Sequence, residues 1–298
     1  MSFLPTNATS GFLDIPTCFG KPTGTPSSMS ADTSKGVYDA ANKAIWIYDQ
    51  VSGEWIMPYP VAACRGRVVG SAGFSPTQLA FDAFFDPNSQ FYSDNGTTLA
   101  VAAATVQLGK NQMNAGASLN MSQSTSGARA TYRVGSNSKA WIEFDGSRYY
   151  ASLTIPCTAG LCTAHLLKFT NTGYHNVYDN DTAGGVANML WVDGSGKLEL
   201  NANGASAAGP YNDGTWRSVI TYSPPNGTGN SKMWVDGTLV INSAALSGTA
   251  GSTLLGLFNR PTGTAPYKGG CGPFGFGSFD PTNYVADLTA WMLAQTPT

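Results

Sequence analysis

Hydrophobic and polar residues alternate regularly from about residue 128 onward. Two copies of the tetrapeptide Trp-Val-Asp-Gly, at Trp191–Gly194 and Trp234–Gly237, each stand between two alternating runs. Asp-Gly between such runs predicts a β-hairpin, because the turn requires positive φ and glycine adopts it without steric cost. We therefore predict two antiparallel hairpins, and we expect both tryptophans to pack in the core between two sheets.

The same alternation predicts further strands in the second half of the chain. These are Ala128–Val134, Ala140–Phe144, Tyr149–Ile155, His165–Phe169, Trp216–Tyr222, Thr253–Phe258 and Tyr284–Met292. Short strands separated by frequent turns are typical of a β-sandwich or jelly roll. The pattern therefore predicts an all-β protein in which helix is nearly absent.

The preceding residues follow a different pattern. Residues 1–30 repeat proline, glycine and threonine without a helical or strand period, and residues 44–57 predict one hairpin. The stretch Gln78–Phe85 fits either a strand or a helical turn, and a short apolar run cannot be settled by its period. We predict an extended anchoring arm at 1–30, a smaller β-rich attachment region at 31–127 and a β-sandwich at 128–298.

The composition supports a turn-rich protein with a neutral polar surface. Only 11% of the residues are charged, the net charge is −2, and the chain contains 35 glycines and 17 prolines. Without a basic run, we expect no nucleic-acid partner. No apolar stretch is long enough to span a bilayer, and residues 1–7 lack the features of a signal peptide, so we expect no membrane insertion and no secretion signal.

Cysteine offers little evidence for cross-linking. The five cysteines are Cys18, Cys64, Cys157, Cys162 and Cys271. An odd number leaves at least one unpaired within the chain, and the spacing does not match a zinc site. We expect the cysteines to behave as small buried hydrophobic residues. A disulfide between Cys157 and Cys162 is the one possible exception.

The order of several short motifs resembles a known family. The motifs are Phe144-Asp145-Gly146, Gly196–Leu200, Gly214–Val219, Met233–Val240, Leu255-Gly256 and Tyr284–Leu288. This succession resembles the concanavalin A-like lectin/glucanase fold in its laminin-G-like form, over roughly residues 140–298. The resemblance implies a jelly-roll β-sandwich in which a late strand, here Tyr284–Leu288, packs beside the first.

Glucanases of that family carry two glutamates in a Glu-x-Asp-x-x-Glu strand, where one acts as nucleophile and the other as acid/base. Glu143-Phe144-Asp145 begins like this motif, but Arg148 occupies the place of the second glutamate. No Gly-x-Ser-x-Gly elbow is present, and His165 lies in an apolar run that favours a packed histidine. The sequence therefore predicts that the protein is not an enzyme and has no catalytic residues.

A polar segment over Tyr174–Asp181 is the best candidate for a binding site, with a solvated turn as the alternative. Aromatic faces and amide groups suit sugars, and carboxylate oxygens suit Ca²⁺. The residues predicted to contact the glycan are Tyr174, His175, Tyr178 and Asn180, and those predicted to coordinate calcium are Asp179 and Asp181. A rim calcium site is also what the laminin-G-like resemblance implies.

The whole chain resembles a spike or fibre protein of a phage or phage-like particle. That resemblance implies an N-terminal arm bound to other virion proteins and a lectin-like domain bound to host surface polysaccharide. We expect a virion protein that forms homo-oligomers, with a trimer as one form. The alternatives are a glycan depolymerase of the same fold and an architectural decoration protein of a capsid or tail.

Overall fold

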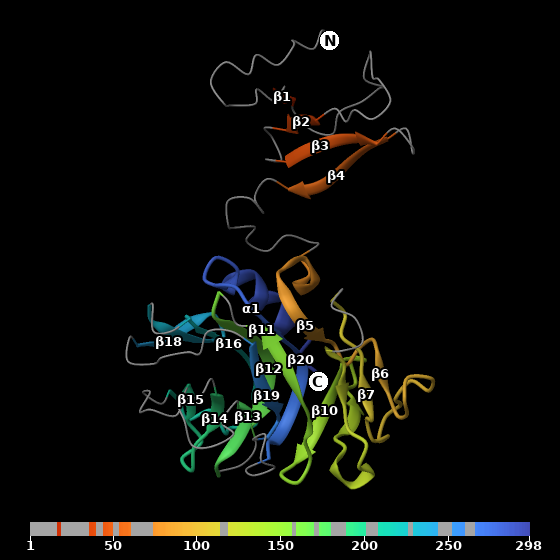
Figure 1. Ribbon diagram of the computed structural model, residues 1–298, viewed down its shortest axis with the longest axis vertical. Coiled ribbons are helices and arrows are strands. Elements are labelled where there is room, and N and C mark those ends of the chain that lie inside the picture. Colours follow the sequence, from red (N-terminus) through yellow and green to blue (C-terminus); the bar gives the residue numbers. More distant parts are fainter. Residues whose placement is uncertain are drawn as a thin grey trace. The chain divides into compact units, whose positions relative to one another are not determined.

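The computed structural model divides the chain into two compact units, Met1–Val69 and Gly70–Thr298, and each is described separately (Figure 1). In the first unit the structure describes four strands. In the second it describes residues 74–113, 119–156, 159–169, 173–179, 189–200, 208–225, 229–243, 252–259 and 266–298.

The first unit contains a four-stranded sheet. Its strands are β1 (Thr17–Cys18), β2 (Gly36–Asp39), β3 (Ala44–Asp49) and β4 (Glu54–Pro60), in the order β1-β2-β3-β4. β3 and β4 pair antiparallel, which confirms the hairpin predicted over residues 44–57. The anchoring role of residues 1–30 and the attachment role of 31–127 stay predictions.

The second unit is a β-sandwich with a small additional sheet. The large sheet has the order β18-β17-β16-β12-β20-β10-β9, with β5 also paired to β20, and the facing sheet has the order β11-β19-β13-β14-β15. The strands of the large sheet are β5 (Phe81–Phe85), β9 (Thr131–Val134), β10 (Ala140–Asp145), β12 (Leu161–Phe169), β16 (Trp216–Ser223), β17 (Ser231–Val235), β18 (Thr238–Ser243) and β20 (Lys268–Gly277). Those of the facing sheet are β11 (Tyr150–Pro156), β13 (His175–Asp179), β14 (Met189–Val192), β15 (Leu198–Leu200) and β19 (Ser252–Leu257).

The remaining elements are short. A three-stranded sheet joins β6 (Phe91–Tyr92), β7 (Leu108–Gly109) and β8 (Met121–Ser122), and there are 3₁₀ turns at Pro76–Gln78 and Ser126–Ala128. One α-helix, α1 (Val285–Ala294), lies near the C-terminal end. The prediction of an all-β protein with a C-terminal β-sandwich is confirmed. Within the described residues, no helix has the length and apolar character needed to cross a bilayer.

The main core lies between the two sheets. Alternate residues of β10, Ile142 and Phe144, are buried in it, and they meet Leu153 and Leu255 from the facing sheet. Because side chains of a strand alternate between faces, the intervening residues of β10 point away from this core. That outer face of the large sheet is partly covered and partly open.

The covered part lies beneath α1. Val285, Leu288 and Met292 are buried in a second core with Leu166 and Trp234. The spacing of the three helical residues places them on one face of a helix. The prediction of a late strand over Tyr284–Met292 is therefore wrong, because these apolar positions follow the helical period and pack against the sheet from outside.

The central strand β20 was missed by sequence reasoning because it is rich in glycine. It pairs antiparallel with both β12 and β10. A Cβ atom at Gly272 would lie 2.8 Å from Leu166 Cδ2, and one at Gly275 would lie 2.7 Å from Phe84 Cδ2. Side chains of neighbouring strands therefore occupy the space above β20, and a strand with low intrinsic β-propensity is stabilised by packing.

Both Trp-Val-Asp-Gly segments form the predicted hairpins, β14–β15 and β17–β18. The expectation that their tryptophans fill the space between the sheets is wrong. Val192 and Val235 occupy that core, so each preceding tryptophan faces outward. Trp234 is covered in the second core, whereas Trp191 is half-buried on the outer face of the facing sheet.

Two of the five cysteines lie among the described residues whose side chains can be assessed. Cys162 and Cys271 are free and buried, as expected for small hydrophobic side chains. Cys157, the predicted disulfide partner of Cys162, lies outside the described residues.

Candidate functional site

The open part of the outer face contains a row of residues that crosses five strands. Cross-strand pairing places Thr131 of β9 opposite Glu143 of β10, Glu143 opposite Gly270 of β20, and Gly270 opposite Lys168 of β12. Lys168 in turn lies opposite Trp216 of β16. Residues that pair directly project from the same face of a sheet, so strands distant in the sequence bring these side chains together.

A cleft of about 370 Å³ lies along this row. Its lining residues are Thr131, Arg133, Trp141, Glu143, Phe144, Asp145, Arg148, Lys168, Lys268, Gly269 and Gly270. All of them come from β9, β10, β12, β20 and the segment after β10. Four cationic and two anionic side chains therefore surround one recess.

Two glycines form the floor of the cleft. Gly269 has a φ of +146°, and a Cβ atom there would collide with the backbone oxygen of Lys168. A Cβ atom at Gly270 would lie 2.7 Å from Trp216 Cη2 and 3.2 Å from Trp141 Cδ1. The missing side chains let the two indole rings meet over the strand, edge to face, with their centroids 6.0 Å apart.

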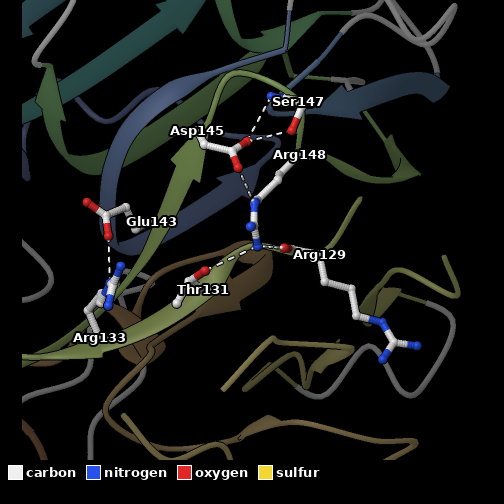
Figure 2. A network of polar contacts seen from close by, with 7 residues as sticks. All are labelled: Arg129, Thr131, Arg133, Glu143, Asp145, Ser147 and Arg148. Carbon is white, nitrogen blue, oxygen red and sulfur yellow. Dashed lines mark hydrogen bonds and ion pairs between the residues drawn. The ribbon is translucent and has the colours of Figure 1, made fainter. Parts of the chain in front are cut away.

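Two ion pairs hold the carboxylates of the cleft. Arg133 Nε lies 2.6 Å from Glu143 Oε2, and Arg148 Nε lies 2.7 Å from Asp145 Oδ2 (Figure 2). Arg148 also donates from Nη1 to Thr131 Oγ1 at 3.1 Å. Half-exposed pairs of this kind contribute little to stability, and their clearer effect is to fix the orientation of the charged groups.

Asp145 is held in its ionised form. Burial opposes ionisation, but hydrogen bonds from Ser147 and from Arg148 outweigh it and lower the pKa of Asp145 to about 2. A general acid needs a pKa near the pH at which it works. Asp145 therefore serves this cleft as a hydrogen-bond acceptor and a negative charge at neutral pH.

The two lysines of the cleft are placed differently from the arginines. Lys168 Nζ lies 6.0 Å from the centroid of the Trp216 ring. The stem of Lys268 runs beside Gly146, where a Cβ atom would lie 3.6 Å from Lys268 Cδ. Within the described part of the chain, neither ammonium group has an ion-pair or hydrogen-bond partner.

The segment predicted from the sequence as the binding site lies in the facing sheet. Residues 175–179 of this polar segment form β13, so the alternative of a solvated turn is wrong for them. Tyr178 is 0% exposed, and its hydroxyl group lies 2.9 Å from Thr221 Oγ1. Asp179 is also 0% exposed and accepts a hydrogen bond from Asn176 Nδ2 at 2.9 Å. Neither side chain is available at the surface.

The other predicted site residues differ in accessibility. Tyr174 is 61% exposed, and its ring lies against Trp191 with centroids 5.3 Å apart. His175 is half-buried, with Nδ1 2.8 Å from the Pro266 carbonyl oxygen. Asn180 and Asp181 lie outside the described residues. The described residues contain no group of three or more potential metal ligands of the His, Cys, Asp and Glu types, and the calcium site stays a prediction.

No family model and no curated protein matches this chain. A sialidase of Trypanosoma rangeli in complex with sialic acid matches with 9% identity and a TM-score of 0.47, over 88% of this chain and 44% of the sialidase. Domain 4 of a GH43 extracellular arabinanase from Geobacillus stearothermophilus, in complex with arabinotriose, matches with 11% identity and a TM-score of 0.39, over 70% and 98% of the two chains.

A further solved match is the CBM40 of Ruminococcus gnavus IT-sialidase bound to α2,6 sialyllactose. It shows 12% identity and a TM-score of 0.36, over 50% of this chain and 96% of that one. This chain spans less than half the length of the sialidase. At these scores the activity of the matched proteins is not transferred to it. The prediction that the chain is not an enzyme is nevertheless contradicted, because the matched structures include sialidases, and it is withdrawn.

Proposed function

We propose that this chain is a spike or fibre protein of a phage or phage-like particle, and that its β-sandwich binds a host surface glycan in the outer-face cleft. The observation that carries the glycan-binding part is the cleft itself. It combines the half-buried indole of Trp141 with fixed charged groups above a glycine floor. Binding sites for small molecules typically join apolar faces to a few well-placed polar groups.

Each group has a distinct contribution to sugar recognition. The indole of Trp141 offers a flat apolar face for the carbon side of a sugar ring. Glu143 and Asp145 accept hydrogen bonds from sugar hydroxyl groups, and hydrogen bonds to ionised groups are stronger than neutral ones. Because Arg133 and Arg148 already hold both carboxylates, little side-chain entropy is lost on binding.

The virion part of the proposal rests on the sequence. The low charge, and the proline-, glycine- and threonine-rich residues 1–30, favour an arm that packs against other virion proteins. In this proposal the chains form homo-oligomers, with a trimer as one form. Particles assembled without the chain should adsorb poorly to the host, and normal adsorption would exclude the receptor-binding role.

The cleft is tested by direct binding of host surface polysaccharide to purified protein. Trp141→Ala and the isosteric Glu143→Gln should each weaken binding about tenfold or more, as measured by calorimetry. Tyr174→Ala removes an exposed aromatic ring from the other sheet and serves as the matched control. If Tyr174→Ala abolishes binding while both cleft variants retain it, the binding site lies on the facing sheet. Thermal unfolding of each variant checks that it is folded.

Cleavage of the bound glycan is the second candidate function. The observation that favours it is the pair of carboxylates, Glu143 and Asp145, on one face of β10 in the same cleft. A depolymerase should release new reducing ends from host polysaccharide, and Glu143→Gln should abolish that release while the protein stays folded. Binding without any release of reducing ends would contradict this candidate.

A further inference from the structure

The charge of the cleft differs from that of the rest of the molecule. The chain has 16 lysines and arginines and a net charge of −2. Four of these cations, Arg133, Arg148, Lys168 and Lys268, line the one cleft, where only Glu143 and Asp145 oppose them. A quarter of all basic residues thus surrounds one recess, and cationic groups exceed anionic groups there by two.

The excess positive charge belongs to the lysines. Glu143 and Asp145 pair with the arginines, whereas Lys168 and Lys268 have no carboxylate partner among the described residues. Both lysines are half-buried. Lys168 lies opposite Gly270 in the neighbouring strand β12, and Lys268 begins β20, two positions before Gly270. Because cationic groups in a recess concentrate their field, an anionic group placed there gains more than it would on a flat surface.

The surroundings of the lysines fit a sugar better than a polynucleotide. The recess holds about 370 Å³ and is flanked by an indole ring and two carboxylates. The carboxylates would repel the run of phosphates along a nucleic acid, but they can accept hydrogen bonds from sugar hydroxyl groups. A sugar that places a single negative group near the two lysines and hydroxyl groups near Glu143 and Asp145 would pair with both the cationic and the anionic side chains of the cleft.

Resting on the proposed glycan binding, we propose that the cleft selects an acidic saccharide and that Lys168 and Lys268 hold the carboxylate of the sugar. Lysine is a strongly hydrated point charge with three donors, so it can pair with a carboxylate without requiring a fixed plane. The Lys168 ammonium group lies over the Trp216 ring, 6.0 Å from its centroid, and this contact restricts its position. The two lysines are therefore specificity-determining residues.

The experiment uses the full-length chain and calorimetry with polygalacturonate, alginate and hyaluronate, each beside its carboxyl-reduced form. A neutral β-glucan and dextran sulfate complete the probes. At least one carboxylated polymer should bind, and its reduced form should bind about tenfold more weakly or worse. Lys168→Gln and Lys268→Gln should produce the same loss and should reduce the dependence of binding on salt.

Lys110→Gln is the matched control. Lys110 Nζ lies 4.6 Å from the centroid of the Tyr92 ring, so it is also a lysine over an aromatic ring, but it does not line the cleft. Its removal changes the net charge equally and should leave binding unchanged. An equal loss in Lys110→Gln would show that only overall charge matters and would overturn the proposal.

The remaining outcomes separate this inference from the proposed function. If the β-glucan or a reduced polymer binds as tightly as its acidic counterpart, and Trp141→Ala abolishes that binding, the acidic specificity is wrong and glycan binding stands. Dextran sulfate that binds as tightly as the carboxylated polymers would overturn the assignment to a carboxylate. If no polymer binds in a Trp141-dependent manner, both the proposed cleft and this inference fail.

Discussion

The absence of a side chain at Gly270 determines how the cleft is built. Trp216 Cη2 and Trp141 Cδ1 occupy the space that a Cβ atom would need. Gly270→Ala should therefore displace the Trp216 ring, lower the free energy of unfolding by about 1–3 kcal/mol through overpacking, and weaken glycan binding. Urea unfolding and intrinsic tryptophan fluorescence measure the two structural effects.

The control for this substitution is Gly127→Ala, because a Cβ atom at Gly127 meets nothing within 4 Å. It should change neither the fluorescence nor the binding. If Gly270→Ala bound glycan as well as the unaltered protein, the indole arrangement above β20 would not matter for recognition.

His165 is a buried titratable group outside the cleft. Its ring is stacked against Tyr178 and Phe274, and both ring nitrogens lack hydrogen-bond partners among the described residues. Burial disfavours the charged form and lowers the pKa of His165 to about 3. Below its unfolded pKa of about 6.5, the unfolded state therefore binds a proton that the folded state does not.

This difference makes stability fall as the pH is lowered from about 6.5 toward 3, by up to about 1.4 kcal/mol per unit. His165→Phe keeps an aromatic ring and removes the titration. Between about pH 7.5 and about pH 5, we expect unaltered protein to lose about 2 kcal/mol more unfolding free energy than this variant. Urea unfolding at both pH values measures the difference, and equal losses would show that His165 is not buried as a neutral ring.

At the scale of elements, α1 stabilises the sandwich by covering one end of the large sheet. Leu288 is wholly buried beneath it, whereas Leu293 on the same helix is 37% exposed. Leu288→Ala should cost about 2–5 kcal/mol of unfolding free energy because it leaves a cavity, and Leu293→Ala about 0.5 kcal/mol or less. Similar losses in urea unfolding would mean that α1 does not pack on the sheet as described.

The elements that could be predicted from the sequence are those with a local signal. Both Asp-Gly turns specify their hairpins, and Ala140–Asp145 alternates clearly enough to identify β10. The helix α1 was missed because Tyr284–Met292 is a short apolar run: every second residue from Tyr284 is apolar, as in a strand, while Val285, Leu288 and Met292 follow the helical period. β20 was missed because five of its ten residues are glycine. Side chains from neighbouring strands pack over these glycines and stabilise the strand.

At the scale of the whole molecule, the cleft depends on strand order, which no local pattern encodes. Alternation in β10 already places Trp141, Glu143 and Asp145 on one face, and the sequence directed attention to Glu143 only as half of a catalytic motif. Lys168 and Gly270 join them because β20 lies between β10 and β12 in the sheet. Such long-range pairing is fixed by the packing of the two sheets, so the full set of cleft residues could not be predicted from the sequence.

The division of the chain into two compact units leads to the last prediction. Both cores, α1 and every residue of the cleft lie within Gly70–Thr298. A fragment of residues 70–298 should therefore fold on its own and bind glycan within about twofold of the full chain, since no contact to the ligand is lost. Calorimetry and thermal unfolding of fragment and full chain provide the comparison.

The same fragment separates binding from attachment in the proposed virion role. Because it keeps the cleft and lacks the predicted anchoring arm, it should compete with particles for host adsorption and should not be incorporated into them. The fragment carrying Trp141→Ala is the control and should not compete. A folded fragment that binds no glycan, beside a full chain that does, would show that residues 1–69 contribute to the binding site.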